Sequence, residues 1–149
     1  MVIHDMTREM NTDLLKRTHF GRIACSRDAQ PYIVPFFFAY HERLIYSFGT
    51  AGTRIEWMRA NPLVCVEVEQ IASRHEWQTV LIFGRYQELP ETPEFHEERV
   101  FAHNLLARTE IWWEPGYVKT LHQGLERPLQ HIYFRISIDQ INGHQGSAE

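Results

Sequence analysis

The sequence predicts a mainly β domain, built as a small antiparallel barrel with helices at its periphery. Short strand-like runs follow one another along the chain, and hairpin-length connections such as residues 27–30 join them. Helical patterns are inserted between the hairpins and do not alternate with every strand. This order argues against a parallel, doubly wound sheet and favours an antiparallel barrel.

The composition is that of a single globular domain over residues 1–149. Its 44% apolar and 13% aromatic content supports a sizeable core. The formal charge of −4 and the lack of a long basic stripe argue against a nucleic-acid-binding protein. Because no apolar run approaches the roughly 20 residues needed to cross a bilayer, no membrane partner is expected.

The N-terminus and the cysteines indicate the compartment. The first residues lack a basic region followed by an apolar core, so we expect no signal peptide. Cys25 and Cys65 stand alone in strand-like runs, as small core residues do in a reducing compartment. We therefore expect a cytoplasmic protein.

Apolar spacing and turn residues place the elements along the chain. We expect helices at 7–17, 53–60 and 92–107. We expect strands at 21–26, 31–40, 43–48, 63–68, 77–88 and 130–138, a polar loop at 69–76 and a tail from about residue 142. Gly84, inside the strand at 77–88, indicates a bulge or a close backbone approach.

The strand expected at 31–40 is apolar on both faces. Its even-numbered residues share one face and its odd-numbered residues share the other, and both sets are apolar. One face therefore fills the core, and the other meets a ligand or a partner subunit. Pro31 and Pro35 cannot donate to a sheet ladder, which places this strand at an edge or beside something other than a strand.

The segment 46–54 leads from a strand through two glycines into a helix. Thr53 stands three residues before Glu56, which is the spacing of an N-terminal capping box. Arg54 falls in the first helical turn, where the helix dipole disfavours a cation. An anion held by backbone N–H groups, the hydroxyls of Thr50 and Thr53 and the Arg54 guanidinium removes this conflict, and phosphate is the natural candidate.

A second interpretation of Arg54 is open at this point, namely an ion pair with a carboxylate such as Glu56 on a surface helix. The segment has neither the Gly-Lys-Ser/Thr ending of a P-loop nor the glycine spacing of a dinucleotide fold. A phosphate site here is therefore of another kind.

Six short motifs follow one another along the chain. They are Gly-Arg-Ile-Ala at 21–24, Pro-Tyr-Ile-Val-Pro at 31–35, Leu-Ile-Tyr-Ser at 44–47, Asn-Pro-Leu-Val-Cys at 61–65, Trp-Gln-Thr-Val at 77–80 and Ile-Asn-Gly at 141–143. Their order and spacing resemble the flavin-binding split-barrel family that includes pyridoxamine 5′-phosphate oxidase. The similarity is greatest to the short branch of that family with the nitroimidazole resistance proteins, and it covers about residues 20–143.

The resemblance implies a six-stranded antiparallel split β-barrel of the Greek-key type, with peripheral helices. It also implies a homodimer with FMN in two symmetric interface clefts. Arg54 matches the family's phosphate-binding Lys/Arg, with Thr53 beside it. The oxidases have Ser-Arg-Lys where this chain has Gly52-Thr53-Arg54, so one phosphate-binding cation is missing here.

The family's flavin ring lies along the strand that matches residues 34–36, where backbone groups meet its polar edge. Residues 78 and 79 match the region that reaches the flavin from the next long strand, although ordinary strand polarity also explains them. The expected cofactor-binding residues are Val34, Pro35, Phe36, Tyr46, Ser47, Thr50, Thr53, Arg54, Gln78 and Thr79.

Three further residues are candidates for substrate contact. His75 precedes the strand at 77–88, which is expected to reach the flavin, although a solvent-exposed loop histidine is the alternative. Trp112 and Trp113 either cap the flavin cleft or seal the dimer interface. These alternatives stay open.

Nine histidines invite a metal hypothesis. His96 and His103 could share a helical face, but no compact pair of the zinc-hydrolase type is present, and we predict no metal site. Cys25 and Cys65 have no adjacent base and are poor nucleophile candidates.

The resemblance implies an FMN-dependent oxidoreductase that is nitroreductase-like and reduces a small substrate with electrons from NAD(P)H. No catalytic residue is predicted, because the flavin supplies the redox chemistry. The oxidases' C-terminal Trp and Arg substrate signature is absent, which disfavours pyridoxamine-phosphate oxidation. Three alternatives remain open: a haem-binding or haem-degrading split barrel, a non-catalytic flavin-binding dimer, and a deazaflavin in place of FMN.

Overall fold

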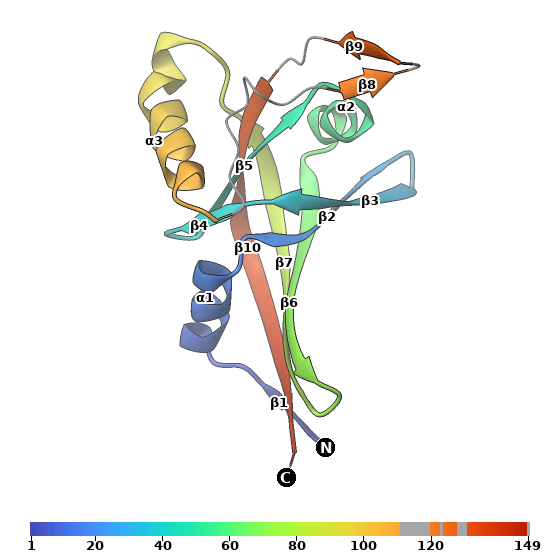
Figure 1. Cartoon of the computed structure of the whole chain (residues 1–149), viewed down its shortest axis with the longest axis vertical. Helices are drawn as coiled ribbons and strands as arrows, with labels where there is room; N and C mark the ends of the chain where they lie inside the picture. Colours follow the sequence, from blue (N-terminus) through green and yellow to red (C-terminus); the bar gives the residue numbers. More distant parts are fainter. Residues whose placement is uncertain (111–119, 123, 128–130, 149) are drawn as a thin grey trace.

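The structure is a computed structural model that describes residues 1–110, 120–122, 124–127 and 131–148. Within these ranges three α-helices lie at the periphery of an antiparallel sheet, with α1 and α3 on one side and α2 near one end (Figure 1). The strands are β1 Val2–Asp5, β2 Phe20–Arg27, β3 Gln30–Phe37, β4 Ala39–His41, β5 Leu44–Thr50, β6 Leu63–Ser73, β7 Glu76–Glu88, β8 Thr120–His122, β9 Leu125–Arg127 and β10 His131–Ser147. The helices are α1 Arg8–Arg17, α2 Thr53–Ala60 and α3 His96–Ala107, with a short 3-10 helix, η1 Pro93–Phe95, before α3.

The sheet order is β3-β2-β6-β7-β10-β5-β4, and β1 pairs with the far end of β10. β8 and β9 form a separate two-stranded sheet. The strands in this order are antiparallel, and the path is open between β3 and β4. The predicted split barrel is therefore confirmed: its six strands are β2, β3, β5, β6, β7 and β10, and the short β1 and β4 extend it to eight.

The strand predicted at 31–40 is interrupted at Phe38, and its two halves form the two ends of the open sheet. The chain therefore crosses the split at this point. Phe38 N donates to His19 O at 2.9 Å, and Ser47 Oγ donates to Phe37 O at 2.5 Å. These two bonds hold the curled sheet together where no strand ladder does.

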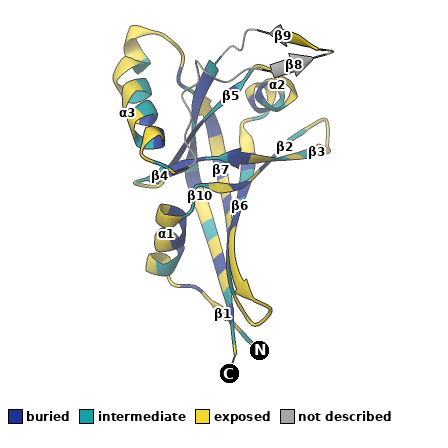
Figure 2. Cartoon of the chain, in the orientation of Figure 1, coloured by how far each residue is buried: buried dark blue, intermediate teal, exposed yellow. Residues whose placement is uncertain are grey.

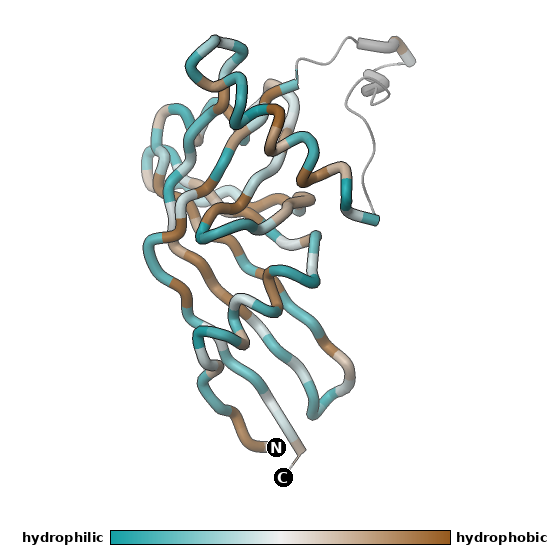
Figure 3. The backbone as a smooth tube through the Cα atoms, turned by 90° about the vertical axis from the view of Figure 1, so that its left-hand side faces the viewer, coloured by the Kyte–Doolittle hydropathy of each residue, from teal (hydrophilic) through white to brown (hydrophobic). Residues whose placement is uncertain are grey.

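One face of each long strand contributes side chains to the core of the barrel. Buried residues accordingly alternate with exposed ones along these strands (Figure 2), and apolar residues recur along them (Figure 3). Phe38, Phe134 and Ile136 are fully buried there. A second, smaller core lies between α3 and the sheet and includes Leu106 and Tyr133. Both clusters are apolar, so burial of this surface is the main source of stability.

Two stretches expected to be irregular are strands. The polar loop predicted at 69–76 is wrong, because β6 continues to Ser73 and β7 starts at Glu76. The tail predicted from residue 142 is also wrong, because β10 continues to Ser147 between β7 and β1. Polar residues on a half-exposed ladder are held by backbone pairing, which composition does not reveal.

The helices agree with the predicted ones in position. Thr7 caps α1 by accepting a hydrogen bond from Met10 N, as a threonine N-cap should. The capping box predicted at Thr53 is wrong, because Gly52 is the N-cap of α2 and makes no side-chain cap bond. Within the described ranges, no helix combines the length and the apolar character that crossing a membrane requires.

Candidate cofactor site

The predicted phosphate site lies where β5 ends and α2 begins. Arg54 is the second residue of α2, and its guanidinium packs 5.6 Å from the centroid of the Phe134 ring. The same guanidinium lies against Gly49, where a Cβ atom would collide with Nη2. The absence of a side chain at Gly49 therefore makes room for Arg54 next to the strand.

Arg54 is a half-buried cation. Burial lowers the pKa of its guanidinium, and the neighbouring Tyr86, Cys25 and Tyr32 partly oppose this effect. None of the ion pairs among the described residues includes Arg54 or Glu56. The structure does not form the carboxylate pair that the sequence left open. A desolvated cation in a first helical turn is unfavourable without a counter-ion.

The groups next to Arg54 in the chain are of the kinds that can bind a phosphate. The first turn of α2 carries no side-chain cap, so its N–H groups face outward at the helix start. Thr50 is half-buried at the end of β5, and Thr53 is exposed at the first position of α2. The residues present therefore fit an anionic group: a phosphate would neutralise the guanidinium and accept from the backbone and the two hydroxyls.

The strand expected to carry the flavin ring is an edge strand, as its prolines predicted. β3 pairs only with β2, with Pro31 opposite Ser26 and Pro35 opposite Arg22. Phe36 is buried in the barrel, whereas Pro35 faces outward. The far edge of β3 pairs with no strand in the described ranges, so its backbone groups can meet a ligand.

The hydroxyls of Tyr46 and Ser47 donate hydrogen bonds to other groups of the same chain. The Tyr46 hydroxyl donates to Glu98 Oε2 at 2.9 Å, and burial followed by this bond raises its pKa. The Ser47 hydroxyl donates to Phe37 O. Both side chains are at most 3% exposed, so in this structure they support β5 and the split, and their contact with a cofactor stays a prediction.

Within a single chain, the other predicted residues that the structure describes lie far from Arg54. Tyr86, near Arg54, lies eight residues after Gln78 in β7, which is roughly 26 Å along a strand. Gln78 and Thr79 therefore lie near the far end of the sheet, where Gln78 accepts from Arg17 at 2.6 Å. His75 is in the exposed β6–β7 turn at that same end. Trp112 and Trp113 fall outside the described residues.

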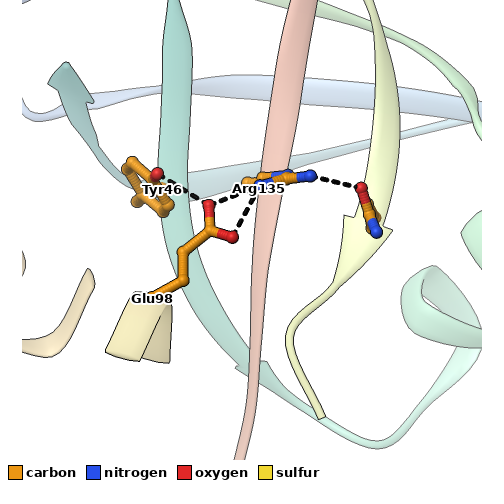
Figure 4. Close-up of polar contacts among 4 residues, drawn as sticks. Tyr46, Glu98 and Arg135 are labelled. Carbon is orange, nitrogen blue, oxygen red and sulfur yellow. Dashed lines mark hydrogen bonds and ion pairs between the residues drawn. The ribbon is translucent and has the colours of Figure 1, made fainter. Parts of the chain in front are cut away.

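A polar network that the sequence did not predict fixes α3 to the sheet (Figure 4). Glu98 of α3 accepts from Arg135 Nη1 at 2.6 and 2.5 Å and from the Tyr46 hydroxyl. Arg135 Nη2 also donates to Gln87 at 2.7 Å. Arg135 lies opposite Tyr46 on one side and Gln87 on the other, so only the strand register brings these groups together. No local pattern in the sequence predicts this network.

The outer side of β3, β2, β6 and β7 presents an apolar surface to solvent, which we call the outer face. Its large exposed residues are Phe20 at 45%, Ile33 at 62%, Leu63 at 55%, Leu81 at 37% and Phe83 at 42%. A shallow cavity of about 340 Å³ lies in it, lined among others by Cys65 and Phe83. Large apolar side chains left in solvent in this number are typical of binding surfaces. One side of β3 does face outward, and its contact with a ligand or a partner subunit stays a prediction.

Histidines form no metal centre in the part of the chain that the structure describes. Within it, no group of three or more His, Cys, Asp or Glu side chains is placed to hold a metal. His96 and His103 do share a face of α3 and line a cavity of about 800 Å³ beside Tyr133. His103 Nδ1 lies 2.8 Å from the Tyr133 hydroxyl.

The two free cysteines differ in burial. Cys25 is buried, whereas Cys65 is half-buried.

Known proteins share this fold and much of this sequence. The family model described as pyridoxamine 5′-phosphate oxidase matches residues 7–145. The chain belongs to this family.

Relatives within the pyridoxamine 5′-phosphate oxidase family extend over the whole chain. An uncharacterized protein of Rhizobium meliloti (strain 1021) is 38% identical over 148 residues, which are 99% of this chain and 98% of that protein. The structure of a FAD-binding protein from Mesorhizobium loti is 37% identical, with a TM-score of 0.81 over 99% of this chain and 100% of that one. These matches support the family and the fold together.

A more distant structure shows the fold alone. It comes from Bacteroides thetaiotaomicron VPI-5482 and is described as a candidate 5-nitroimidazole antibiotic resistance protein. It is 14% identical, with a TM-score of 0.68 over 97% of this chain and 89% of that one. The split barrel is therefore common to this chain and to the predicted branch of the family.

Proposed function

We propose that this protein is a flavin-dependent oxidoreductase that binds FMN at the start of α2 and reduces a small substrate with electrons from NAD(P)H. The observation that carries the proposal is Arg54, a half-buried cation in a first helical turn that has no carboxylate partner among the described residues. Family membership supports a flavin, and the 37% identical relative is a FAD-binding protein.

Each group of residues has a defined task in this proposal. Arg54 neutralises the flavin phosphate, while Thr50 and Thr53 donate hydroxyl hydrogen bonds to it. The free edge of β3 offers backbone groups to the polar edge of the ring. The apolar outer face excludes water from the bound ring, which strengthens these polar contacts.

The redox chemistry belongs to the cofactor. When bound, the isoalloxazine ring accepts two electrons from a nicotinamide donor and supplies them to a small oxidised substrate, such as a nitroaromatic compound. The chain itself binds and orients the ring, and the proposal needs no nucleophile or acid–base pair from the protein.

FAD is the second candidate cofactor, and the Mesorhizobium loti relative favours it. FMN and FAD share the ring and the phosphate next to the ribityl chain. Arg54 has the same task toward either one, so the choice between them depends on room for the adenosine half.

The proposal includes a homodimer. The outer face leaves five large apolar side chains 37–62% exposed, which is unfavourable for an isolated chain. Gln78 and Thr79 lie at the other end of β7 from the residues around Arg54, so one chain alone cannot bring both sets to one flavin. A second copy packed on this face can supply the missing half of the site.

The visible spectrum of the purified protein is the first test. We expect flavin absorption bands, either as purified or after addition of FMN or FAD, and bleaching of these bands by NAD(P)H. A colourless protein that binds neither flavin would contradict the proposal, and a Soret band would favour haem. Bound flavin that NAD(P)H never reduces would indicate a non-catalytic binding protein.

The role of Arg54 has its own test. Arg54→Ala removes a charge-assisted contact worth about 1.5–3 kcal/mol, so FMN affinity should fall about tenfold to a hundredfold. Riboflavin has no phosphate, and its affinity should change less than FMN affinity. Arg59→Ala is the matched control, because Arg59 lies in the last turn of α2 and pairs with Glu88 at the surface. Equal losses for FMN and riboflavin would overturn the phosphate role.

A further inference from the structure

The outer face is not uniformly apolar, because three charged residues lie in its middle. Arg22 of β2 lies directly opposite Glu67 of β6, and Glu69 follows two residues later on the same side. Arg22 Nη1 is 3.3 Å from Glu69 Oε1 and 4.0 Å from Glu67 Oε2. One guanidinium therefore serves two carboxylates, and the group carries a net charge of −1 when both are ionised.

Uncharged neighbours surround this group on the sheet. Across β7, Leu81 lies opposite Glu67 and Thr79 lies opposite Glu69. On the other side, Pro35 of β3 lies opposite Arg22. Within the described ranges, the other titratable or charged groups on this side are Cys65, two residues before Glu67 on β6, and Arg85, which pairs with Asp139 and lies four residues after Leu81 on β7. Farther along the sheet, His144 lies past Thr79 on β10 beside Asp5, and Arg17 of α1 bonds to Gln70 and Gln78.

Glu67 is the residue of this group that is hardest to keep ionised. Its Oε1 atom is buried and has no hydrogen-bond partner among the described residues. Burial, and then the nearby carboxylate of Glu69, raise the pKa of Glu67 to about 7, while Arg22 acts in the opposite direction. A proton on Glu67 removes the excess negative charge and lets its carboxyl group donate a hydrogen bond to the neighbouring Glu69 carboxylate.

We propose that the outer face is a proton-linked interface, in which a second copy of this chain docks more tightly when each Glu67 carries a proton. This inference rests on the homodimer of the proposed function and adds its regulation by pH.

Charge balance favours a second copy as the partner. A two-fold interface sets a surface against itself, so two arginines and four carboxylates would be buried together. With one proton taken up by each chain, two arginines face two carboxylates and no net charge is buried. Without these protons two negative charges remain in an apolar interface, where desolvation opposes association.

The direction of the effect follows from linkage. Docking removes Glu67 further from water, so its pKa is higher in the dimer than in the free chain. Association is then strongest below about pH 7 and weakens as the pH rises through the pKa of the dimer. Each proton contributes at most tenfold per pH unit, so the dimer dissociation constant rises at most about a hundredfold per unit for two protons.

The test is the dimer dissociation constant of the full chain at pH 6.5, 7.5 and 8.5, measured by sedimentation velocity over a dilution series. We expect the wild type to dissociate at least tenfold more readily at pH 8.5 than at pH 6.5. Glu67→Gln keeps the shape and removes the charge, so it should dimerise tightly at all three values. Glu97→Gln, on the exposed side of α3, is the matched control and should behave as the wild type does.

The possible outcomes distinguish failure of the dimer from failure of its proposed dependence on a Glu67 proton. A chain that is monomeric at every pH, with and without Glu67→Gln, overturns the dimer itself. A dimer with a dissociation constant independent of pH, or equally dependent in Glu67→Gln, overturns only the role of Glu67. If the dimer does not dissociate, the Glu67 carboxyl carbon shift in NMR decides: a midpoint above pH 7 supports the proposal, and a midpoint below pH 5 overturns it.

Discussion

The guanidinium of Arg54 fills the space that Gly49 leaves open, and a Cβ atom at Gly49 would collide with its Nη2 atom. The glycine thus controls where the cation lies. Gly49→Ala should displace the guanidinium without disrupting the fold, because the atom it meets is the end of a flexible side chain. We expect FMN affinity to fall about tenfold, as for the loss of one charge-assisted contact, with a smaller change for riboflavin.

The control for this substitution is the second glycine of the same turn. Gly52 has extended backbone and no atom within 4 Å of an added Cβ, so Gly52→Ala should leave flavin affinity nearly unchanged. If both alanine variants bind FMN as the wild type does, the position of Arg54 does not depend on Gly49.

Arg54 should also lower the stability of the protein when no flavin is bound. It is a desolvated cation without an ion-pair partner among the described residues, and replacing such a charge by an apolar side chain of similar size is often stabilising. Arg54→Met should therefore raise the free energy of unfolding of the flavin-free protein by about 1 kcal/mol, as measured with urea. A clear loss of stability would show that the guanidinium has a structural partner in place of a ligand.

The fold was predictable where local sequence decides it. The helix predicted at 53–60 is α2, and the prolines of β3 placed that strand at the edge. The polar stretches at 69–76 and 142–147 were missed, because both are held as strands by pairing with β7, and the second also by pairing with β1. Such ladders depend on residues far apart in the chain, and their side chains show no apolar pattern.

The candidate site was likewise predictable only where local sequence indicates it. Arg54 was recognisable because a cation in a first helical turn conflicts with a local rule. Glu98 and Arg135 were not, because 37 residues separate them and only the packing of α3 on β10 brings them together. The break at Phe38 was also invisible, since the apolar pattern of 31–40 continues through it although the chain there passes between the two ends of the sheet.

The Glu98–Arg135 pair should be the main polar support of α3. Glu98→Gln removes the negative charge from a half-buried arginine while keeping the length of the side chain. We expect the free energy of unfolding to fall by about 1–3 kcal/mol, as when one partner of a charged hydrogen bond is removed. Glu97→Gln, at the adjacent exposed position, should change it by less than about 0.5 kcal/mol. Equal effects of the two variants would contradict a structural role for the pair.

Tyr46 shares this network, so a double-mutant cycle can measure the coupling. Tyr46→Phe removes the donor to Glu98 and should destabilise the protein by about 1 kcal/mol. In the Glu98→Gln background the same change should have a smaller effect, because the charged acceptor is already gone. Additive losses would mean that Tyr46 and Glu98 act independently.

Glu67 should make folding depend on pH. Its pKa is about 7 in the folded chain against an ordinary 4.5, so the folded state binds the proton more tightly. The resulting stabilisation is fully present below about pH 4.5 and is lost as the pH rises through 7. Relative to Glu67→Gln at equal protein concentration, the wild type should therefore lose stability as the pH rises from 5 to 8. A stability difference that stays constant over this range would contradict the raised pKa.

Gly84 should tolerate no side chain, because the backbone of β10 approaches it closely. A Cβ atom there would lie 2.5 Å from Ser137 O and 2.7 Å from Ile136 Cγ2. Unlike the arginine end beside Gly49, the Ser137 carbonyl belongs to a paired strand and cannot move without disturbing the ladder next to the irregularity at residues 138–140. Gly84→Ala should lower the free energy of unfolding by about 1–3 kcal/mol, as overpacking does. Urea unfolding compared with Gly52→Ala measures this difference, and similar midpoints for the two variants would mean that β10 can shift away from β7.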